Sequence, residues 1–131
     1  MTFRIPFSGR SHNYTDGEIS IAVEAMRTAV PLTQGSYLRA FEENFRQYTG
    51  TEHAFAVSNA TAGLELAAQL CQFQTGDEVI IPAHTFTSSA YPFVKAGARV
   101  IWADIDPITR VVSTQSIASC INSRTRVIVV P

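Results

Sequence analysis

The stretch that most constrains the fold is residues 54–71, where an apolar run leads through a polar turn into a helical pattern. The run Ala54–Val57 has the composition of a short buried strand. After the turn, apolar residues recur at i, i+3, i+4 and i+7, the period of a helix, at Leu64, Ala67, Ala68 and Cys71. The sequence therefore predicts a strand that turns directly into a helix.

The turn itself, Ser58–Gly63, has the chemistry of an anion site. Residues of N-cap type lie at three of its positions, Ser58, Asn59 and Thr61. A helix N-terminus presents unpaired N–H groups and a partial positive charge, and the small residues Ala60, Ala62 and Gly63 would let a phosphate approach the backbone. Taken alone, the same residues also fit an ordinary capped helix of an α/β protein.

Strand and helix patterns alternate from residue 53 onwards. Strands are predicted over 78–82, 99–103 and 126–130, and helices over 61–73, 89–96 and 115–122. Such alternation is typical of the α/β class, a mostly parallel sheet with helices on both faces. These sheets bind ligands beyond the carboxyl ends of their strands, where the turn 58–63 and the loop 84–88 both belong. Neither GxGxxG nor GxxxxGK[ST] occurs, which argues against an unrelated nucleotide-binding module.

The first part of the chain has a different pattern. After an irregular stretch over residues 1–14, Thr15 and Glu18 form a capping box that opens a helix to about Ala29. Ser36 is expected to cap a second helix, which ends near Gly50 and buries the face formed by Leu38, Phe41, Phe45 and Tyr48. We therefore expect two parts, a helical segment over 1–52 and the first part of an α/β domain over 53–131.

Composition narrows the function classes. Of 131 residues, 46% are hydrophobic and 16% are charged, which favours a folded domain over a disordered one. The net charge of −1 without a basic cluster argues against nucleic acid and membrane surfaces as partners. Cys71 and Cys120 fit neither a disulfide framework nor a metal site, and no signal peptide or membrane anchor is evident, so a cytoplasmic location is expected.

A series of short segments along the chain forms a recognisable pattern: Ile5–Phe7, Leu32–Gly35, Phe41–Glu42, Ala56–Leu64, Gly76–Ile80 with Pro82, Thr85–Ser88, Gly97–Ala98, Asp104–Pro107 and Thr125–Ile128. In this order, these stretches resemble the DegT-type sugar-nucleotide aminotransferases, pyridoxal-phosphate (PLP) enzymes of the aspartate-aminotransferase fold. The resemblance covers nearly the whole chain.

The resemblance implies that this α/β part is the N-terminal part of the PLP-binding large domain. It assigns the PLP phosphate to the backbone N–H groups of Thr61 and Ala62, with the Thr61 hydroxyl as a further donor. It places Phe86 where the family stacks an aromatic ring on the pyridine. Gln34 corresponds to a segment that borders the substrate site in relatives.

The implied reaction moves an amino group, typically from glutamate, to a nucleotide-linked keto sugar, in a homodimer of the full-length form. The lysine that binds the cofactor covalently is expected beyond Pro131, so no catalytic residue is assigned within the chain and the isolated chain is expected to be inactive. Lys95, its sole lysine, does not match that position. Because a core strand directly precedes Pro131, we expect a fragment, a truncated reading frame or one part of a longer enzyme. Two alternatives stay open, a dehydratase with histidine in place of lysine and a non-catalytic fragment or pseudoenzyme.

Overall fold

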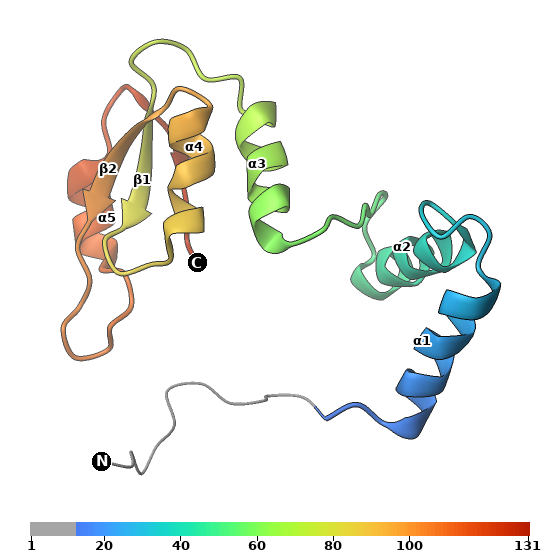
Figure 1. The fold of residues 1–131 in the computed structure, drawn as a ribbon. Coiled ribbons are helices and arrows are strands. Elements are labelled where there is room, and N and C mark those ends of the chain that lie inside the picture. The colour runs from blue at the N-terminus through green and yellow to red at the C-terminus, as the bar shows by residue number, and fades with distance from the viewer. Residues whose placement is uncertain (1–12) are drawn as a thin grey trace, which may run out of the picture. The chain divides into compact units, whose positions relative to one another are not determined.

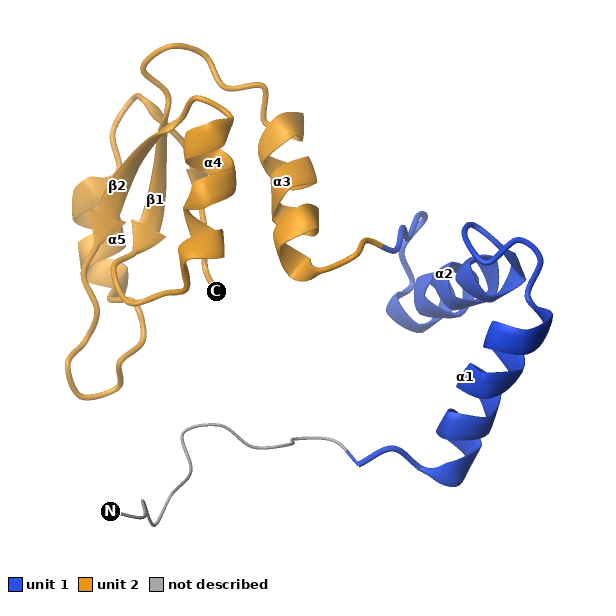
Figure 2. Ribbon diagram, viewed as in Figure 1, with its two compact units in different colours: residues 1–56 blue, residues 57–131 orange. Residues whose placement is uncertain are grey.

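The computed structural model describes residues 13–131 and divides the chain into two compact units, residues 1–56 and 57–131. Figure 2 shows them in different colours. The first 12 residues, including Ile5–Phe7 and most of the expected irregular stretch, lie outside the described part. The expected division into 1–52 and 53–131 stays a prediction, and in the structure residues 53–56 group with unit 1.

Unit 2 is built on a parallel three-stranded sheet in the order β2-β1-β3. The strands are β1 (Glu78–Pro82), β2 (Arg99–Ala103) and β3 (Thr125–Ile128). They are joined through α4 (Tyr91–Lys95) and α5 (Thr114–Cys120), which lie on opposite faces of the sheet (Figure 1). The α/β fold class predicted from the alternating pattern is thereby confirmed.

The core of unit 2 forms between this sheet and two helices. Val79 and Ile81 of β1 are fully buried and pack in one cluster with Ala68 of α3 (Ala60–Leu70) and Phe93 of α4. Ile80 is also fully buried and, because side chains alternate along a strand, it faces the opposite side of the sheet. The central strand is thus covered on both faces, as its uninterrupted apolar sequence predicts.

A buried carboxylate fixes the start of the sheet. The Glu78 side chain is 1% exposed, and its Oε1 lies 2.9 Å from Nη2 of Arg124. Its Oε2 accepts a 2.8 Å hydrogen bond from Nδ2 of Asn122, and its backbone N–H donates to the carbonyl of Arg124. These contacts tie β1 to the segment that leads into β3. Glu78 is therefore a structural residue at the amino ends of the strands.

Unit 1 contains α1 (Asp16–Thr28) and α2 (Ser36–Thr49). The predicted capping box is present, with Thr15 and Glu18 satisfying each other's backbone N–H groups. The N-cap of α2 is Gly35 rather than Ser36, and no side chain caps this helix. The expected burial of the α2 face is wrong for the described chain, because Phe41, Phe45 and Tyr48 are exposed and Leu38 is half-buried.

Residues 54–57 do not form the predicted strand. They run between α2 and α3 without joining the sheet, and Phe55 and Val57 are exposed. One backbone group here has a partner, the Ala56 N–H, which donates to Oε1 of Glu42 at 2.9 Å. An apolar run becomes a strand only when another strand pairs with it, and within residues 13–131 none does.

Candidate functional site

The first candidate element is the N-terminal turn of α3, which begins after the N-cap Asn59. The Asn59 backbone is extended, and its Oδ1 accepts a 2.9 Å hydrogen bond from the Ala62 N–H. Its Nδ2 donates to Oγ of Ser58 at 3.3 Å, and the Gly63 N–H donates to the Asn59 carbonyl. One of the two amides predicted to bind a phosphate is therefore already engaged by the cap.

Three other donors of this turn are open. In the part of the chain that the structure describes, nothing accepts a hydrogen bond from the N–H groups of Ala60 and Thr61 or from the Thr61 hydroxyl. Two adjacent open amides and a hydroxyl at a helix N-terminus suit a dianionic phosphate. A phosphate that also used the Ala62 amide would share it with Asn59 or displace that side chain.

The sequence indicated Asn59 as a possible N-cap, but it did not indicate which backbone N–H donates to the Asn59 side chain. An N-cap side chain accepts from the N–H two or three residues later, which from Asn59 is Thr61 or Ala62. The same rule leaves the first helical amide, that of Ala60, as an additional donor. An asparagine at position 59 could therefore have indicated both the engaged amide of Ala62 and the open amide of Ala60.

The second candidate element is Phe86, in the loop between β1 and α4. Its side chain is 78% exposed. It precedes the 3₁₀ turn η1 (Thr87–Ser89), which packs against both α3 and α4. The loop follows the carboxyl end of β1 and lies at the same end of unit 2 as the first turn of α3 (Figure 1). The structure thus brings the two sequence-predicted elements to one end of one unit.

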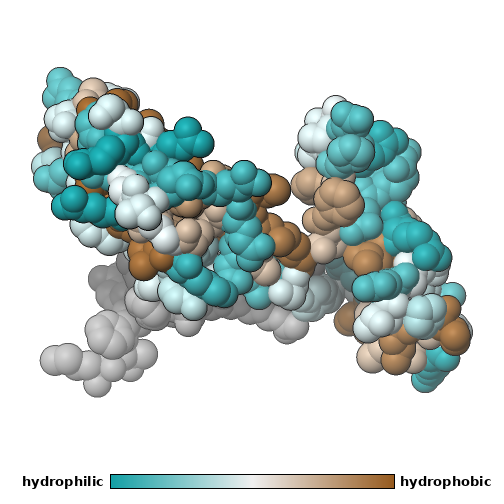
Figure 3. All heavy atoms as spheres, turned by 90° about the horizontal axis from the view of Figure 1, so that it is seen from above, coloured by the Kyte–Doolittle hydropathy of each residue, from teal (hydrophilic) through white to brown (hydrophobic). Residues whose placement is uncertain are grey.

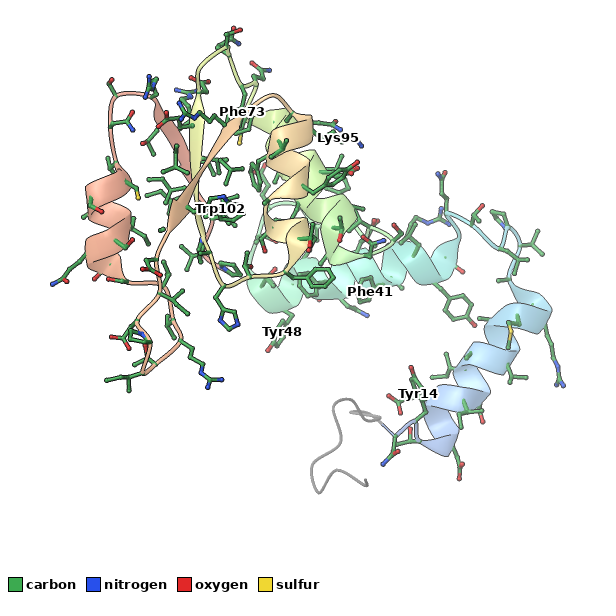
Figure 4. The ribbon with its side chains drawn as sticks, turned by 60° about the vertical axis from the view of Figure 1, so that its left-hand side comes forward. Tyr14, Phe41, Tyr48, Phe73, Lys95 and Trp102 are labelled. Atoms are coloured by element: carbon green, nitrogen blue, oxygen red, sulfur yellow. The ribbon has the colours of Figure 1, made fainter. Side chains whose placement is uncertain are left out.

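Phe86 also borders a shallow hollow with a volume of about 360 Å³. Aromatic and apolar side chains dominate its lining, which is formed by Ala83, Thr85, Phe86, Thr87, Ala90, Tyr91, Val94 and Trp102. Trp102 lies on β2 (Figure 4). An exposed ring beside an open hollow is free to stack on a planar ligand.

Lys95 forms an ion pair with a carboxylate of α3. Its Nζ lies 3.1 Å from Oε1 of Glu65 and 5.9 Å from the centre of the Tyr91 ring. The hydrogen bond that Lys95 donates to Glu65 raises the pKa of Lys95, so its amine stays protonated at neutral pH. A lysine that attacks a carbonyl has to lose its proton, and Lys95 is arranged to keep it. That Lys95 has no catalytic role stays a prediction.

Gln34 belongs to unit 1. Its φ is +54°, its side chain is exposed, and its carbonyl accepts a 3.4 Å hydrogen bond from Nη1 of Arg39. None of these contacts involves the candidate elements of unit 2. Its expected role at the border of a substrate site stays a prediction.

Asp106, which follows β2, builds a turn. Oδ1 of Asp106 accepts from the N–H groups of Ile108 and Thr109, both at 2.8 Å, and these bonds lower the pKa of the Asp106 carboxyl. Across residues 13–131, no three His, Cys, Asp or Glu side chains are grouped to hold a metal ion. No helix in this range has the length and apolar character needed to span a bilayer.

Comparison with known proteins settles the family. The model of the DegT/DnrJ/EryC1/StrS aminotransferase family matches residues 13–130, almost the whole described chain. The chain belongs to this family. It is also 38% identical over 94 residues to a 3-amino-5-hydroxybenzoate synthase from Amycolatopsis mediterranei, and this match covers 72% of the chain and 24% of the relative.

Two solved structures show the same fold. A protein described as a sugar aminotransferase, Spr1654 from Streptococcus pneumoniae in its PLP form, is 31% identical with a TM-score of 0.80 over 96% of this chain and 31% of its own. A GDP-4-keto-6-deoxymannose-3-dehydratase with a trapped PLP–glutamate geminal diamine is 26% identical, with a TM-score of 0.74 over 94% and 33%. The chain spans about a quarter to a third of the length of these relatives.

Proposed function

We propose that unit 2 holds pyridoxal phosphate, with the first turn of α3 at the phosphate and Phe86 against the ring. Thr61 and Ala62 are the amides assigned to the phosphate, and the open amide of Ala60 joins them. The observation that carries this proposal is a pair of open amides at the end of unit 2 where the loop of the exposed Phe86 also lies. The PLP form of a solved relative that covers most of this chain supports it.

The residues of this chain bind and orient the cofactor in this proposal. The α3 amides anchor the phosphate through charge-assisted hydrogen bonds, and Phe86 limits the tilt of the ring by stacking. PLP, when bound, serves as the electron sink that lets an amino group leave one substrate and join another. Within residues 13–131 we assign no residue to the proton transfers.

We infer that the protein that carries this chain is an aminotransferase with a nucleotide-linked keto sugar as acceptor and glutamate as donor. Sequence resemblance and the sugar aminotransferase among the similar structures support the acceptor, with Gln34 near its site. The PLP–glutamate adduct in a similar structure supports the donor. We further propose that it acts as a homodimer in the cytoplasm, where its two free cysteines would stay reduced.

A sugar dehydratase is the second candidate, because a dehydratase structure aligns over 94% of this chain at 26% identity. Both candidates use the same cofactor site. Their reactions differ in the residues that transfer protons, and we assign none of these within residues 13–131. They are separated by the products: a transaminase leaves an amino sugar, whereas the dehydratase leaves a deoxy keto sugar.

The test uses the protein at its natural length, loaded with PLP and mixed with glutamate and then with a nucleotide-linked keto sugar. The aminotransferase proposal expects glutamate to convert the bound cofactor to its amino form, seen by absorbance, and the keto sugar to restore it with formation of an amino sugar. A deoxy product would favour the dehydratase. No spectral response to any amino acid would contradict both enzymatic candidates and favour a pseudoenzyme.

The ring-stacking role has a matched pair of variants. Phe86 and Phe55 are 78% and 80% exposed, so either can be changed to Ala without opening a core. Phe86→Ala is expected to weaken PLP binding about two- to tenfold, since an aromatic pair contributes about 0.5–1.5 kcal/mol. Phe55→Ala should leave the affinity unchanged. An equal effect of both variants, or of neither, would remove Phe86 from the site.

A further inference from the structure

A buried hydroxyl lies three residues after Phe86 in the chain. The Ser89 residue is 6% exposed, which makes it one of two buried polar or charged residues in the described part of the chain. Its Oγ lies 2.8 Å from Oγ1 of Thr85, and the two hydroxyls share one hydrogen bond. No other side chain contacts the Ser89 hydroxyl at hydrogen-bond distance among the described residues. The hydrogen bond between these two hydroxyls therefore links positions 85 and 89.

The bond closes a small ring around Phe86. Thr85 immediately precedes Phe86, and Ser89 ends the 3₁₀ turn that follows it. The Ser89 N–H also donates to the Phe86 carbonyl at 2.9 Å, and the Phe86 backbone is held extended with φ −81° and ψ 149°. The loop start is fixed independently, because the Ala83 N–H donates to the Ala103 carbonyl at 2.9 Å.

Such closure matters because the Phe86 ring receives little support from its own packing. A side chain that is 78% exposed is held little by neighbours, so the backbone at residue 86, which restricts the allowed rotamers, limits the directions that the ring can take. The Thr85–Ser89 bond and the Ser89–Phe86 bond restrict that backbone from both sides. Stacking requires the ring to stay in one plane, and each rotational freedom removed in advance favours binding.

We propose that Ser89 is a positioning residue of the cofactor site, which acts through Thr85 to hold the Phe86 ring in its stacking orientation. This inference rests on the proposed function, since it assumes that Phe86 stacks on PLP. It assigns to Ser89 no contact with the cofactor. A purely structural role would instead let Ser89 stabilise unit 2 without regard to Phe86.

A double-mutant cycle separates these two roles, because coupling between residues appears only when one acts through the other. PLP is titrated into the apo protein at its natural length, and dissociation constants are measured for Ser89→Ala, Phe86→Ala and the double variant. Thermal melts of the apo forms record stability separately. Ser88→Ala is the matched control, a neighbouring half-buried serine whose hydroxyl has no partner among the described residues.

We expect Ser89→Ala to weaken PLP binding about two- to tenfold when Phe86 is present and to add no further loss when Phe86 is already Ala. Ser88→Ala should bind like the wild type, and Thr85→Ser, which keeps the hydroxyl, should as well. Should Ser89→Ala fail to fold, Thr85→Val removes the same bond at a half-buried position and carries the same expectation.

Two outcomes overturn the inference while leaving the cofactor site intact. One is an unchanged affinity in Ser89→Ala together with a weakened Phe86→Ala. The other is an equal loss from Ser89→Ala in both backgrounds, which would show a role independent of Phe86. Unchanged affinity in Phe86→Ala would overturn the stacking role itself, and with it this inference.

Discussion

The two units of the chain differ in how far their apolar side chains are buried. In unit 2, Val79, Ile80 and Ile81 of the central strand are fully buried between helices on both faces of the sheet. In unit 1, neither α1 nor α2 has a buried residue, and aromatic and aliphatic side chains such as Phe45 and Met26 reach the surface. Hydrophobic residues are visible among polar ones on the face drawn in Figure 3.

The difference shows which forces hold each unit. Burial of apolar surface, at about 25 cal/mol per Å², stabilises unit 2. Unit 1 relies on local contacts within its helices, such as the capping box of α1 and the bidentate pair between Glu43 and Arg46 on α2. That pair lowers the pKa of Glu43 to about 2. Local contacts of this kind are individually weak, so the two units should respond differently to matched changes.

The largest contrast is expected between two isoleucines. Ile81→Ala removes a fully buried side chain of β1 and should destabilise unit 2 by about 2–5 kcal/mol, through lost burial and a cavity. Ile21→Ala removes a side chain of α1 that is 58% exposed and should change stability by no more than about 0.5 kcal/mol. Denaturant unfolding measures both changes, followed by Trp102, the sole tryptophan, for unit 2 and by the circular dichroism of the helices for unit 1. Equal effects of the two changes would contradict the comparison.

A smaller contrast concerns two glutamates. Glu78→Ala removes a buried carboxylate with three side-chain partners and should cost about 1–3 kcal/mol. The loss stays in this range because the arginines left behind, Arg99 and Arg124, are largely exposed and can be hydrated. Glu65→Ala breaks a partly exposed pair with Lys95 and should cost less than about 1 kcal/mol. Thermal melts of both variants test the order, which a larger loss from Glu65→Ala would reverse.

In unit 1, the cap of α1 should matter more than its apolar side chains. Thr15→Ala removes the hydroxyl that accepts from the Glu18 N–H and should cost about 1 kcal/mol of helix stability. Ser20→Ala, in the middle of the same helix, should be neutral or slightly stabilising because Ala is the better helix former. Amide hydrogen exchange across residues 16–28 measures both. Faster exchange in Ser20→Ala than in Thr15→Ala would show that capping is not what holds α1.

The smallest expected effect depends on pH. Folding lowers the pKa of Asp106 below its ordinary value of 3.8, chiefly through the Thr109 and Ile108 N–H groups. Its contribution to the turn is therefore complete above pH 3.8 and is lost as the pH falls through the lower folded value. NMR shifts of the Ile108 and Thr109 amides should follow this loss, and Asp106→Asn should remove the pH dependence. A transition above pH 5 would contradict the assignment.

Features encoded locally were predictable from the sequence. The Thr15–Glu18 capping box and the strands at 78–82 and 99–103 follow from short-range spacing and composition. The run 54–57 could not be judged in this way, because an apolar stretch becomes a strand only if another strand lies beside it.

The candidate site was predictable to the same extent. Thr61 and Phe86 could be assigned from resemblance, since they lie in recognisable stretches of sequence. The engagement of the Ala62 amide by Asn59 and the bond between Thr85 and Ser89 depend on side-chain directions, which sequence spacing allows but does not fix. These two contacts are what the structure adds to the site.

The central claim is that the open amides at the start of α3 bind the phosphate of PLP. Ala60→Pro tests it directly, because proline at the first helical position removes an N–H while keeping the helix, and the extended backbone of Asn59 tolerates a following proline. Thr114→Pro makes the same change at the first position of α5, after the extended N-cap Ser113. The measurement is the dissociation constant of each apo variant, at natural length, for PLP and for pyridoxal, which lacks the phosphate.

We expect Ala60→Pro to weaken PLP binding about tenfold or more, since a hydrogen bond to a charged group contributes about 1.5–3 kcal/mol. Its affinity for pyridoxal should stay that of the wild type, and Thr114→Pro should bind both compounds normally. The account is contradicted if Ala60→Pro binds PLP as tightly as the wild type, or if PLP and pyridoxal affinities fall together.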